Sequence, residues 1–239
     1  MSSDKLIVAL DVDELKKAQK LVDELKEVVS IFKIGSQLFT KEGPDVIKMV
    51  HRKKCRVFLD LKFHDIPNTV ANAAEIVTSM GVFMFNVHVH GGRAMMRETV
   101  LRAEKTAKKL KIKKPLIIGV TVLTSLDEFD IKELGIKRFL KDQALYLSKL
   151  AKEFGLDGVV SSAQEAKRIK QICGEDFKII CPGIRPGGAQ LQDQKRVMTP
   201  KEAITQGADF LVIGRPIIEA RNPVKVARQV VEEIEGSGQ

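Results

Sequence analysis

The feature that most constrains the fold of this chain is an alternation of short apolar runs with longer segments of helical periodicity. Eight runs rich in β-branched residues have the length of buried parallel strands. They are Leu6 to Val12, Ile31 to Gly35, Arg56 to Lys62, Met84 to His90, Leu116 to Leu123, Gly158 to Ala163, Lys178 to Ile184 and Phe210 to Ile217. Eight repeats of strand then helix predict a closed (β/α)8 TIM barrel of the α/β class.

The segments between the runs carry apolar residues at helical spacing and residues suited to helix starts. The first segment has Leu15, Ala18, Leu21, Val22 and Leu25. Asp13 and Ser162 can cap helices, and Thr199 before Pro200 is a typical pair for the N-cap and the first helical position. Each segment is also long enough to form the helix that connects two parallel strands.

Length and composition indicate one globular domain over residues 1–239, because a single barrel of this kind takes about 250 residues. Apolar residues make up 44% of the chain and charged residues 30%, which argues against a disordered chain. No stretch approaches 18 apolar residues, so we expect neither secretion nor a membrane partner. The 3 cysteines follow no CxxC spacing, which suits packing residues of a cytoplasmic protein.

The formal net charge of +9 raises the question of a nucleic-acid partner. Lysines recur along a helical stretch at Lys105, Lys108, Lys109, Lys111, Lys113 and Lys114. With 1 Tyr and no Trp, few aromatic side chains are available to stack on bases. We therefore expect a solvated helix face and no nucleic-acid partner, while the surplus charge would attract an anionic small molecule.

Charged and polar residues gather where the predicted strands end, which is the active-site face of such barrels. They are Asp11, Lys33, Asp60, Lys62, His88, His90, Arg185 and Arg215. Uncompensated burial of charge is costly, so complementary charges at one end of several strands indicate a site.

Asp60 and Lys62 are the centre of the predicted chemistry. They lie two residues apart on one strand, so both side chains face the barrel interior. Asp65 follows just past the strand end, and Lys33 on the neighbouring strand is the nearest further cation. The carboxylates favour the ammonium form of Lys62, which could then protonate a strongly basic carbon. The alternative is a structural ion-pair network.

A second signal, at the end of the last strand, indicates a phosphate site. Gly214 lets backbone N–H groups approach an anion, a helix start favours negative charge, and Arg215 can bind phosphate through two hydrogen bonds. The glycine-rich stretch from Pro182 to Lys195 has the composition of a lid, from which Arg185 and Gln194 could close on a ligand. The alternative for this stretch is an ordinary surface loop.

These motifs resemble orotidine 5'-phosphate decarboxylases of the bacterial type. Residues 60–69 read Asp-Leu-Lys-Phe-His-Asp-Ile-Pro-Asn-Thr, which is similar to that family's third-strand signature almost letter for letter. The other matching motifs, in order, are Leu10–Asp11, Phe32–Gly35, Asn86–His88, Leu123–Ser125, Pro182–Pro186 and Ile213–Pro216. The resemblance therefore runs through the whole chain.

The resemblance implies decarboxylation of orotidine 5'-phosphate to uridine 5'-phosphate, without metal or cofactor, by a homodimer with shared active sites. It makes Lys62 the proton donor and places Asp60 against the substrate carboxylate. The other substrate contacts that it implies are Asp11 and Lys33 at the ribose, Thr124 at the pyrimidine, Arg185, Gln194, Gly214 and Arg215 at the phosphate, and Pro182. Asp65, Ile66 and Thr69 would reach into the partner's site.

One departure from the family is His90, where a small residue is more usual. His88 and His90 on one strand face could form half of a metal site, but only His51 and His64 remain as further histidines. We expect no metal there and interpret His88 as a hydrogen-bonded core residue near the site.

Two other functions are compatible with parts of the pattern. A sugar-phosphate barrel, such as a keto-gulonate-phosphate decarboxylase or hexulose-phosphate synthase, shares the Asp-x-Lys-x-x-Asp strand but uses magnesium and an enediolate. His64, the segment from Ile66 to Thr69 and the turn from Leu123 to Ser125 favour the pyrimidine substrate. A non-enzymatic module that binds phosphoribosyl ligands or RNA is the third possibility.

Overall fold

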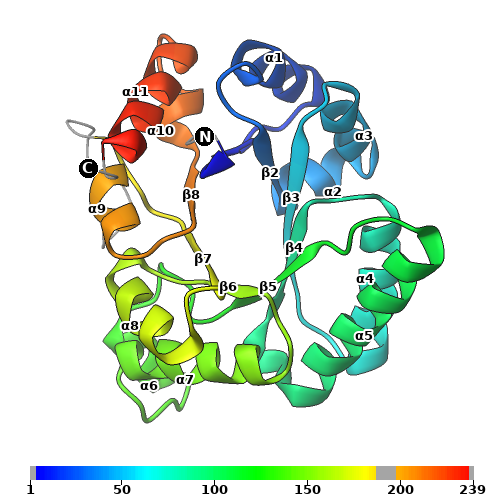
Figure 1. Cartoon of the computed structure of the whole chain (residues 1–239), viewed down its shortest axis with the longest axis vertical. Coiled ribbons are helices and arrows are strands. Elements are labelled where there is room, and N and C mark those ends of the chain that lie inside the picture. Colours follow the sequence, from blue (N-terminus) through cyan, green and yellow to red (C-terminus); the bar gives the residue numbers. More distant parts are fainter. Residues whose placement is uncertain (1–3, 187–197, 237–239) are drawn as a thin grey trace.

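The computed structural model describes residues 4–186 and 198–236, and its strands close into one parallel barrel in the order β1 to β8 (Figure 1). The strands are β1 (Leu6–Ala9), β2 (Ile31–Gly35), β3 (Arg56–Phe63), β4 (Met84–His88), β5 (Leu116–Val120), β6 (Gly158–Val160), β7 (Lys178–Cys181) and β8 (Phe210–Ile213). Ile7 pairs with Ile31 on one side and Val212 on the other, which closes the ring. The predicted (β/α)8 barrel is confirmed.

Helices surround the strands, and α11 lies beside α1 so that the outer ring also closes (Figure 1). The helices are α1 (Leu15–Leu25), α2 (Ser36–Glu42), α3 (Asp45–Arg52), α4 (Pro67–Ser79), α5 (Gly92–Leu110), α6 (Glu128–Glu133), α7 (Leu140–Glu153), α8 (Ala163–Cys173), α9 (Pro200–Thr205), α10 (Arg215–Ile218) and α11 (Pro223–Glu235). The predicted helical spacing of α1 is confirmed, because Ala18, Val22 and Leu25 are its buried residues.

The apolar core has two layers, as expected when strand side chains alternate between the barrel interior and the helices. The larger cluster lies between strands and helices and includes Val8, Phe32 and Phe85. The smaller one fills the barrel and contains Ile7, Ala9, Ile31, Phe58, Met84, Ile118, Ile180 and Val212. This inner layer supports the carboxyl ends of the strands from below.

Most strands end earlier than the sequence predicts. Strand β1 ends at Ala9 rather than Val12, and β8 ends at Ile213 rather than Ile217; β4, β5, β6 and β7 are shortened in the same way. After β4 the chain forms a short 3₁₀ helix, Val89–Gly91. The predicted strands are too long because Val89 and Ile217 remain buried past the last paired residue. The apolar run in the sequence therefore continues after strand pairing has stopped.

The predicted helix starts are correct in two of the three places. The Ser162 hydroxyl accepts a hydrogen bond from Gln164 N–H, and Thr199 forms a reciprocal capping box with Glu202. The prediction for Asp13 is wrong, because Glu14 occupies the N-cap of α1 and Asp13 pairs with Lys17 instead. Asp13 lies one residue before the N-cap, and its carboxylate pairs with Lys17 in the first turn of the helix.

The described residues include no helix with both the length and the apolar character that a bilayer crossing requires. Cys55, Cys173 and Cys181 are buried and form no disulfide. Burial raises the pKa of each of these thiols, so all three act as small packing residues.

Candidate active site

A pocket of about 260 Å³ opens at the carboxyl ends of the strands. Its apolar floor is the top of the inner core, with Phe58, Ile180 and Val212. The predicted site residues that line it are Asp11, Lys33, Asp60, Lys62, Thr124, Pro182, Arg185, Gly214 and Arg215. The pocket therefore brings together residues from β1, β2, β3, β5, β7 and β8 or from the loops after them.

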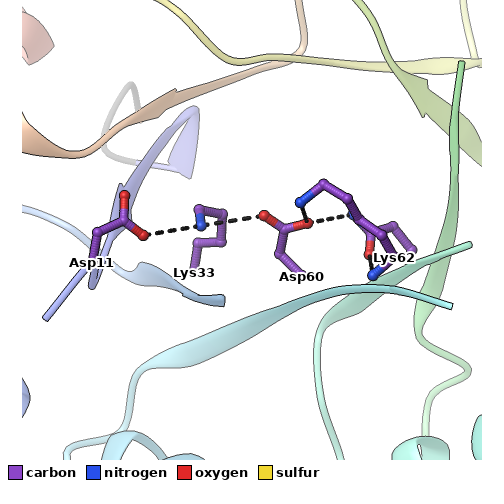
Figure 2. A network of polar contacts seen from close by, with 5 residues as sticks. Asp11, Lys33, Asp60 and Lys62 are labelled. Carbon is purple, nitrogen blue, oxygen red and sulfur yellow. Dashed lines mark hydrogen bonds and ion pairs between the residues drawn. The ribbon is translucent and has the colours of Figure 1, made fainter. Parts of the chain in front are cut away.

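Four of these side chains form a continuous line of alternating charge, Asp11, Lys33, Asp60 and Lys62 (Figure 2). Lys33 Nζ lies 3.3 Å from Asp11 Oδ1 and 3.2 Å from Asp60 Oδ2. Lys62 Nζ lies 2.7 Å from Asp60 Oδ1. Each oxygen of Asp60 thus contacts a different ammonium group, and Lys62 stands at the end of the line.

Burial and ion pairing act in opposite directions on this line. Burial alone would raise the pKa of Asp60, which is 8% exposed, but Lys33, Lys62 and a hydrogen bond from Asn86 lower it below its ordinary value. Burial alone would lower the pKa of Lys33, but Asp60 and Asp11 raise it. Asp60 and Lys33 therefore remain a charged pair at neutral pH.

The backbone at Lys62 departs from regular strand geometry. Lys62 has φ of 49°, in the left-handed region, which costs a non-glycine residue about 1–2 kcal/mol. The register with β4 shifts between Leu59 and Phe63, so β3 bulges at this point. In a regular strand, alternation alone would bring the two side chains to one face; here they meet as predicted, but through a bulge.

Asn86 was not predicted as a site residue, although it belongs to a matched motif. It lies on β4, is fully buried, and its Nδ2 donates a 2.7 Å hydrogen bond to Asp60 Oδ1. Its Oδ1 accepts a 2.8 Å hydrogen bond from Lys62 N–H. The available signal was a carboxamide in an otherwise apolar run, beside the strand that carries Asp60 and Lys62.

The β7 and β8 side of the pocket presents two arginines. Arg185 is 7% exposed, and its Nε has no hydrogen-bond partner in the described part of the chain. A buried donor left without an acceptor is costly. At Gly214 a Cβ would lie 2.9 Å from Asp11 Oδ2 and 3.3 Å from Ala9 Cβ, so a larger residue there would displace the Asp11 carboxylate and crowd β1.

The family model described as "Orotidine 5'-phosphate decarboxylase / HUMPS family" matches residues 4–230. The chain belongs to this family. The resemblance that was stated from the motifs alone is thereby confirmed.

Two similar members of the family are named as orotidine 5'-phosphate decarboxylases. The one from Moorella thermoacetica is 49% identical over 235 residues, which cover 98% of this chain and 93% of that protein. The one from Syntrophomonas wolfei is 48% identical over 236 residues, covering 98% and 99%. A crystal structure of the Lactobacillus acidophilus orotidine 5'-phosphate decarboxylase has a TM-score of 0.85 at 34% identity, covering 97% of this chain and 99% of that one.

Some residues that the family resemblance assigns to the site do not line the pocket. Asp65, Ile66 and Thr69 are exposed around the turn from β3 into α4, and Ile66 is 67% exposed. Asp65 Oδ1 accepts a hydrogen bond from Ile66 N–H at 2.6 Å. These three residues therefore lie outside the pocket of their own chain. Gln194 lies outside the described residues.

Three of the 4 histidines, His64, His88 and His90, lie near one another beside Lys62. The rings of His64 and His88 are 5.3 Å apart, and burial, followed by the charges of His64 and His90, lowers the pKa of His88 to about 4. The two rings are tilted by 35° to each other, and the expected hydrogen bond of His88 stays a prediction. In the same part of the chain, no group of three or more metal-ligand side chains has a geometry that could hold an ion.

Proposed function

We propose that this chain decarboxylates orotidine 5'-phosphate to uridine 5'-phosphate and carbon dioxide, in the synthesis of pyrimidine nucleotides. The observation that carries the proposal is the line Asp11, Lys33, Asp60 and Lys62, which ends in an ammonium group inside a pocket that also contains two arginines. Membership of the family supports the same reaction, as do the two relatives that are 49% and 48% identical to this chain.

The chemical difficulty is the charge left behind at C6 of the pyrimidine. When the bond from C6 to the carboxylate breaks, carbon dioxide leaves and the electron pair stays on C6, in the plane of the ring. A fixed ammonium group is the simplest way to stabilise that pair, because its charge is already oriented before the bond breaks. In the proposed mechanism Lys62 does this and then transfers a proton from Nζ to C6, so no metal or organic cofactor is needed.

Asp60 has two functions in this proposal. It positions Lys62 through the 2.7 Å contact, and its negative charge disfavours the substrate carboxylate more than the transition state, in which that carboxylate is losing its charge. Lys33 keeps Asp60 ionised, as the lowered pKa of Asp60 indicates. Asp11 and Lys33 would also contact the ribose hydroxyls, while Thr124 and Pro182 would contact the substrate from the loops after β5 and β7.

The phosphate would bind beside Arg185, Gly214 and Arg215, together with Gln194. The Nε of buried Arg185, which has no hydrogen-bond partner among the described residues, supports this placement. Gly214 and Arg215 line the same pocket. The contribution expected from a helix start is small here, because α10 has only 4 residues. Charge-assisted hydrogen bonds from the arginines would therefore provide most of the binding.

The proposed assembly is a homodimer in which Asp65, Ile66 and Thr69 complete the partner's pocket. Their exposure on the rim beyond Lys62 supports this arrangement, and the large exposed side chain of Ile66 suits an interface. An isologous contact through this turn would give two equivalent shared sites.

The test is to dialyse the purified protein against EDTA and then to follow its turnover of orotidine 5'-phosphate by ultraviolet absorbance. We expect full activity without added metal, because Lys62 supplies the stabilising charge. Absence of turnover would refute the proposal. Activity that EDTA abolishes and magnesium restores would favour sugar-phosphate chemistry, in which a metal stabilises an enediolate.

A further inference from the structure

Asn86 is the one polar side chain in the middle of β4, between the buried residues Phe85 and Val87. Its carboxamide is fully buried, which would be costly unless both of its polar ends had partners. It does not line the pocket and lies behind the ion-pair line rather than in it. Any effect on substrate must therefore pass through the residues that it contacts.

Both partners of Asn86 belong to the proposed catalytic pair. Nδ2 donates to Asp60 Oδ1 at 2.7 Å, and Oδ1 accepts from Lys62 N–H at 2.8 Å. These two contacts fix the orientation of the amide. In the flipped orientation Asn86 Oδ1 would face the Asp60 carboxylate and its NH₂ group would face Lys62 N–H, so neither hydrogen bond could form. One side chain thus joins the carboxylate of Asp60 to the backbone of Lys62.

The bulge in β3 explains why such a link is needed. The four steps from Leu59 to Phe63 are matched by only two steps from Phe85 to Val87 on β4. Lys62 lies in this bulge and has a left-handed φ of 49°. Its N–H donates a hydrogen bond to the side-chain oxygen of Asn86. The Asn86 carboxamide is therefore the partner that stabilises an otherwise unfavourable backbone conformation.

We infer that Asn86 is a positioning residue, which holds Asp60 Oδ1 and the backbone of Lys62 so that Lys62 Nζ points at the reacting carbon. This inference rests on the proposed decarboxylation. Asp60 Oδ1 receives hydrogen bonds from both Lys62 Nζ and Asn86 Nδ2, while Oδ2 faces Lys33. Without Asn86, Asp60 can rotate and Lys62 can return to extended geometry, although the arginines that face the phosphate are unchanged.

The main test is Asn86→Leu, which has a similar volume but neither hydrogen bond. We expect kcat to fall about 100-fold, as for a small misplacement of a reacting group, while KM changes less than about threefold. The acidic limb of kcat/KM should move to higher pH, because a donor that lowers the pKa of Asp60 is lost. The matched control is Thr99→Val, which removes a hydrogen bond donated by a fully buried hydroxyl in α5; Thr99 does not line the pocket.

A purely structural role would lower the melting temperature in both variants and leave kcat and the acidic limb unchanged in both. That result for Asn86→Leu would overturn the inference while wild-type turnover still supported the decarboxylase. A wild-type protein without turnover would remove both proposals together.

A second variant decides the question if Asn86→Leu does not fold. Asn86→Asp retains an acceptor for Lys62 N–H but regains a donor toward Asp60 only when the new carboxyl group is protonated. We therefore expect its kcat relative to wild type to be low at neutral pH and to rise as the pH falls. A ratio that does not change with pH would contradict the positioning role.

Discussion

Arg185 and Arg215 are the residues through which the proposal is most easily tested by single substitution. A hydrogen bond to a charged group contributes about 1.5–3 kcal/mol, and phosphate binding also helps to assemble the site. Arg215→Ala should therefore lower kcat/KM for orotidine 5'-phosphate by about 100-fold. Arg168→Ala, which removes an exposed arginine paired with Asp142, is the control and should have little effect. Equal kcat/KM values for Arg215→Ala and wild type would show that Arg215 does not bind the phosphate.

His88 gives a prediction for stability against pH. In the folded protein burial holds its pKa at about 4, whereas an unfolded histidine titrates near 6.5. Between these values the unfolded chain binds more protons, so the free energy of unfolding falls as the pH drops from about 6.5 to about 4 and is independent of this group above that range.

The test compares the urea unfolding of wild type and of His88→Gln between about pH 4 and about pH 6.5. Because His88 is half-buried and solvent screens part of its interactions, we expect the free energy of unfolding of wild type to fall across this window by on the order of 1 kcal/mol more than that of His88→Gln. Parallel stability curves for the two proteins would show that His88 does not titrate in this way.

At the scale of elements, the order and type of the strands could be predicted from the sequence, but their ends and the β3 bulge could not. Periodicity reports burial, and residues such as Ile217 stay buried after strand pairing has stopped. The position of Lys62 beside Asp60 was predicted from alternation, yet its left-handed backbone depends on the side chain of Asn86 from the next strand. That contact is tertiary, so no local pattern in β3 contains it.

The cap of α9 is a local feature that was predicted correctly, and it can be tested separately from function. Thr199 Oγ1 accepts from Glu202 N–H, and Glu202 accepts in return from Thr199 N–H. Thr199→Ala should destabilise the protein by about 1 kcal/mol and lower the melting temperature by about 2–4 °C. Thr205→Ala, at the other end of the same helix, should have a smaller effect. An unchanged melting temperature for the Thr199 variant would mean that the cap contributes nothing to stability.

At the scale of the whole molecule, the positions of Asp65 and Lys62 make a strong prediction about assembly. Lys62→Ala and Asp65→Ala should each be inactive as homodimers. After mixing and subunit exchange, one site of each heterodimer carries both substitutions, and the other has intact Lys62 from one chain and intact Asp65 from its partner. With equal amounts, roughly a quarter of all sites should regain activity. No recovery despite demonstrated exchange would show that Asp65 serves its own subunit.

The most direct measurement is the reaction of orotidine 5'-phosphate with the protein in D₂O, analysed by NMR at C6 of the product. Proton transfer from a fully exchanged Lys62 ammonium predicts uridine 5'-phosphate with deuterium at C6. Lys62→Ala should reduce the rate by at least about 10⁴-fold while the fold, checked by circular dichroism, is retained. Recovery of unchanged substrate with the wild-type protein, product without deuterium at C6, or near-normal turnover by Lys62→Ala would contradict the proposed function of Lys62.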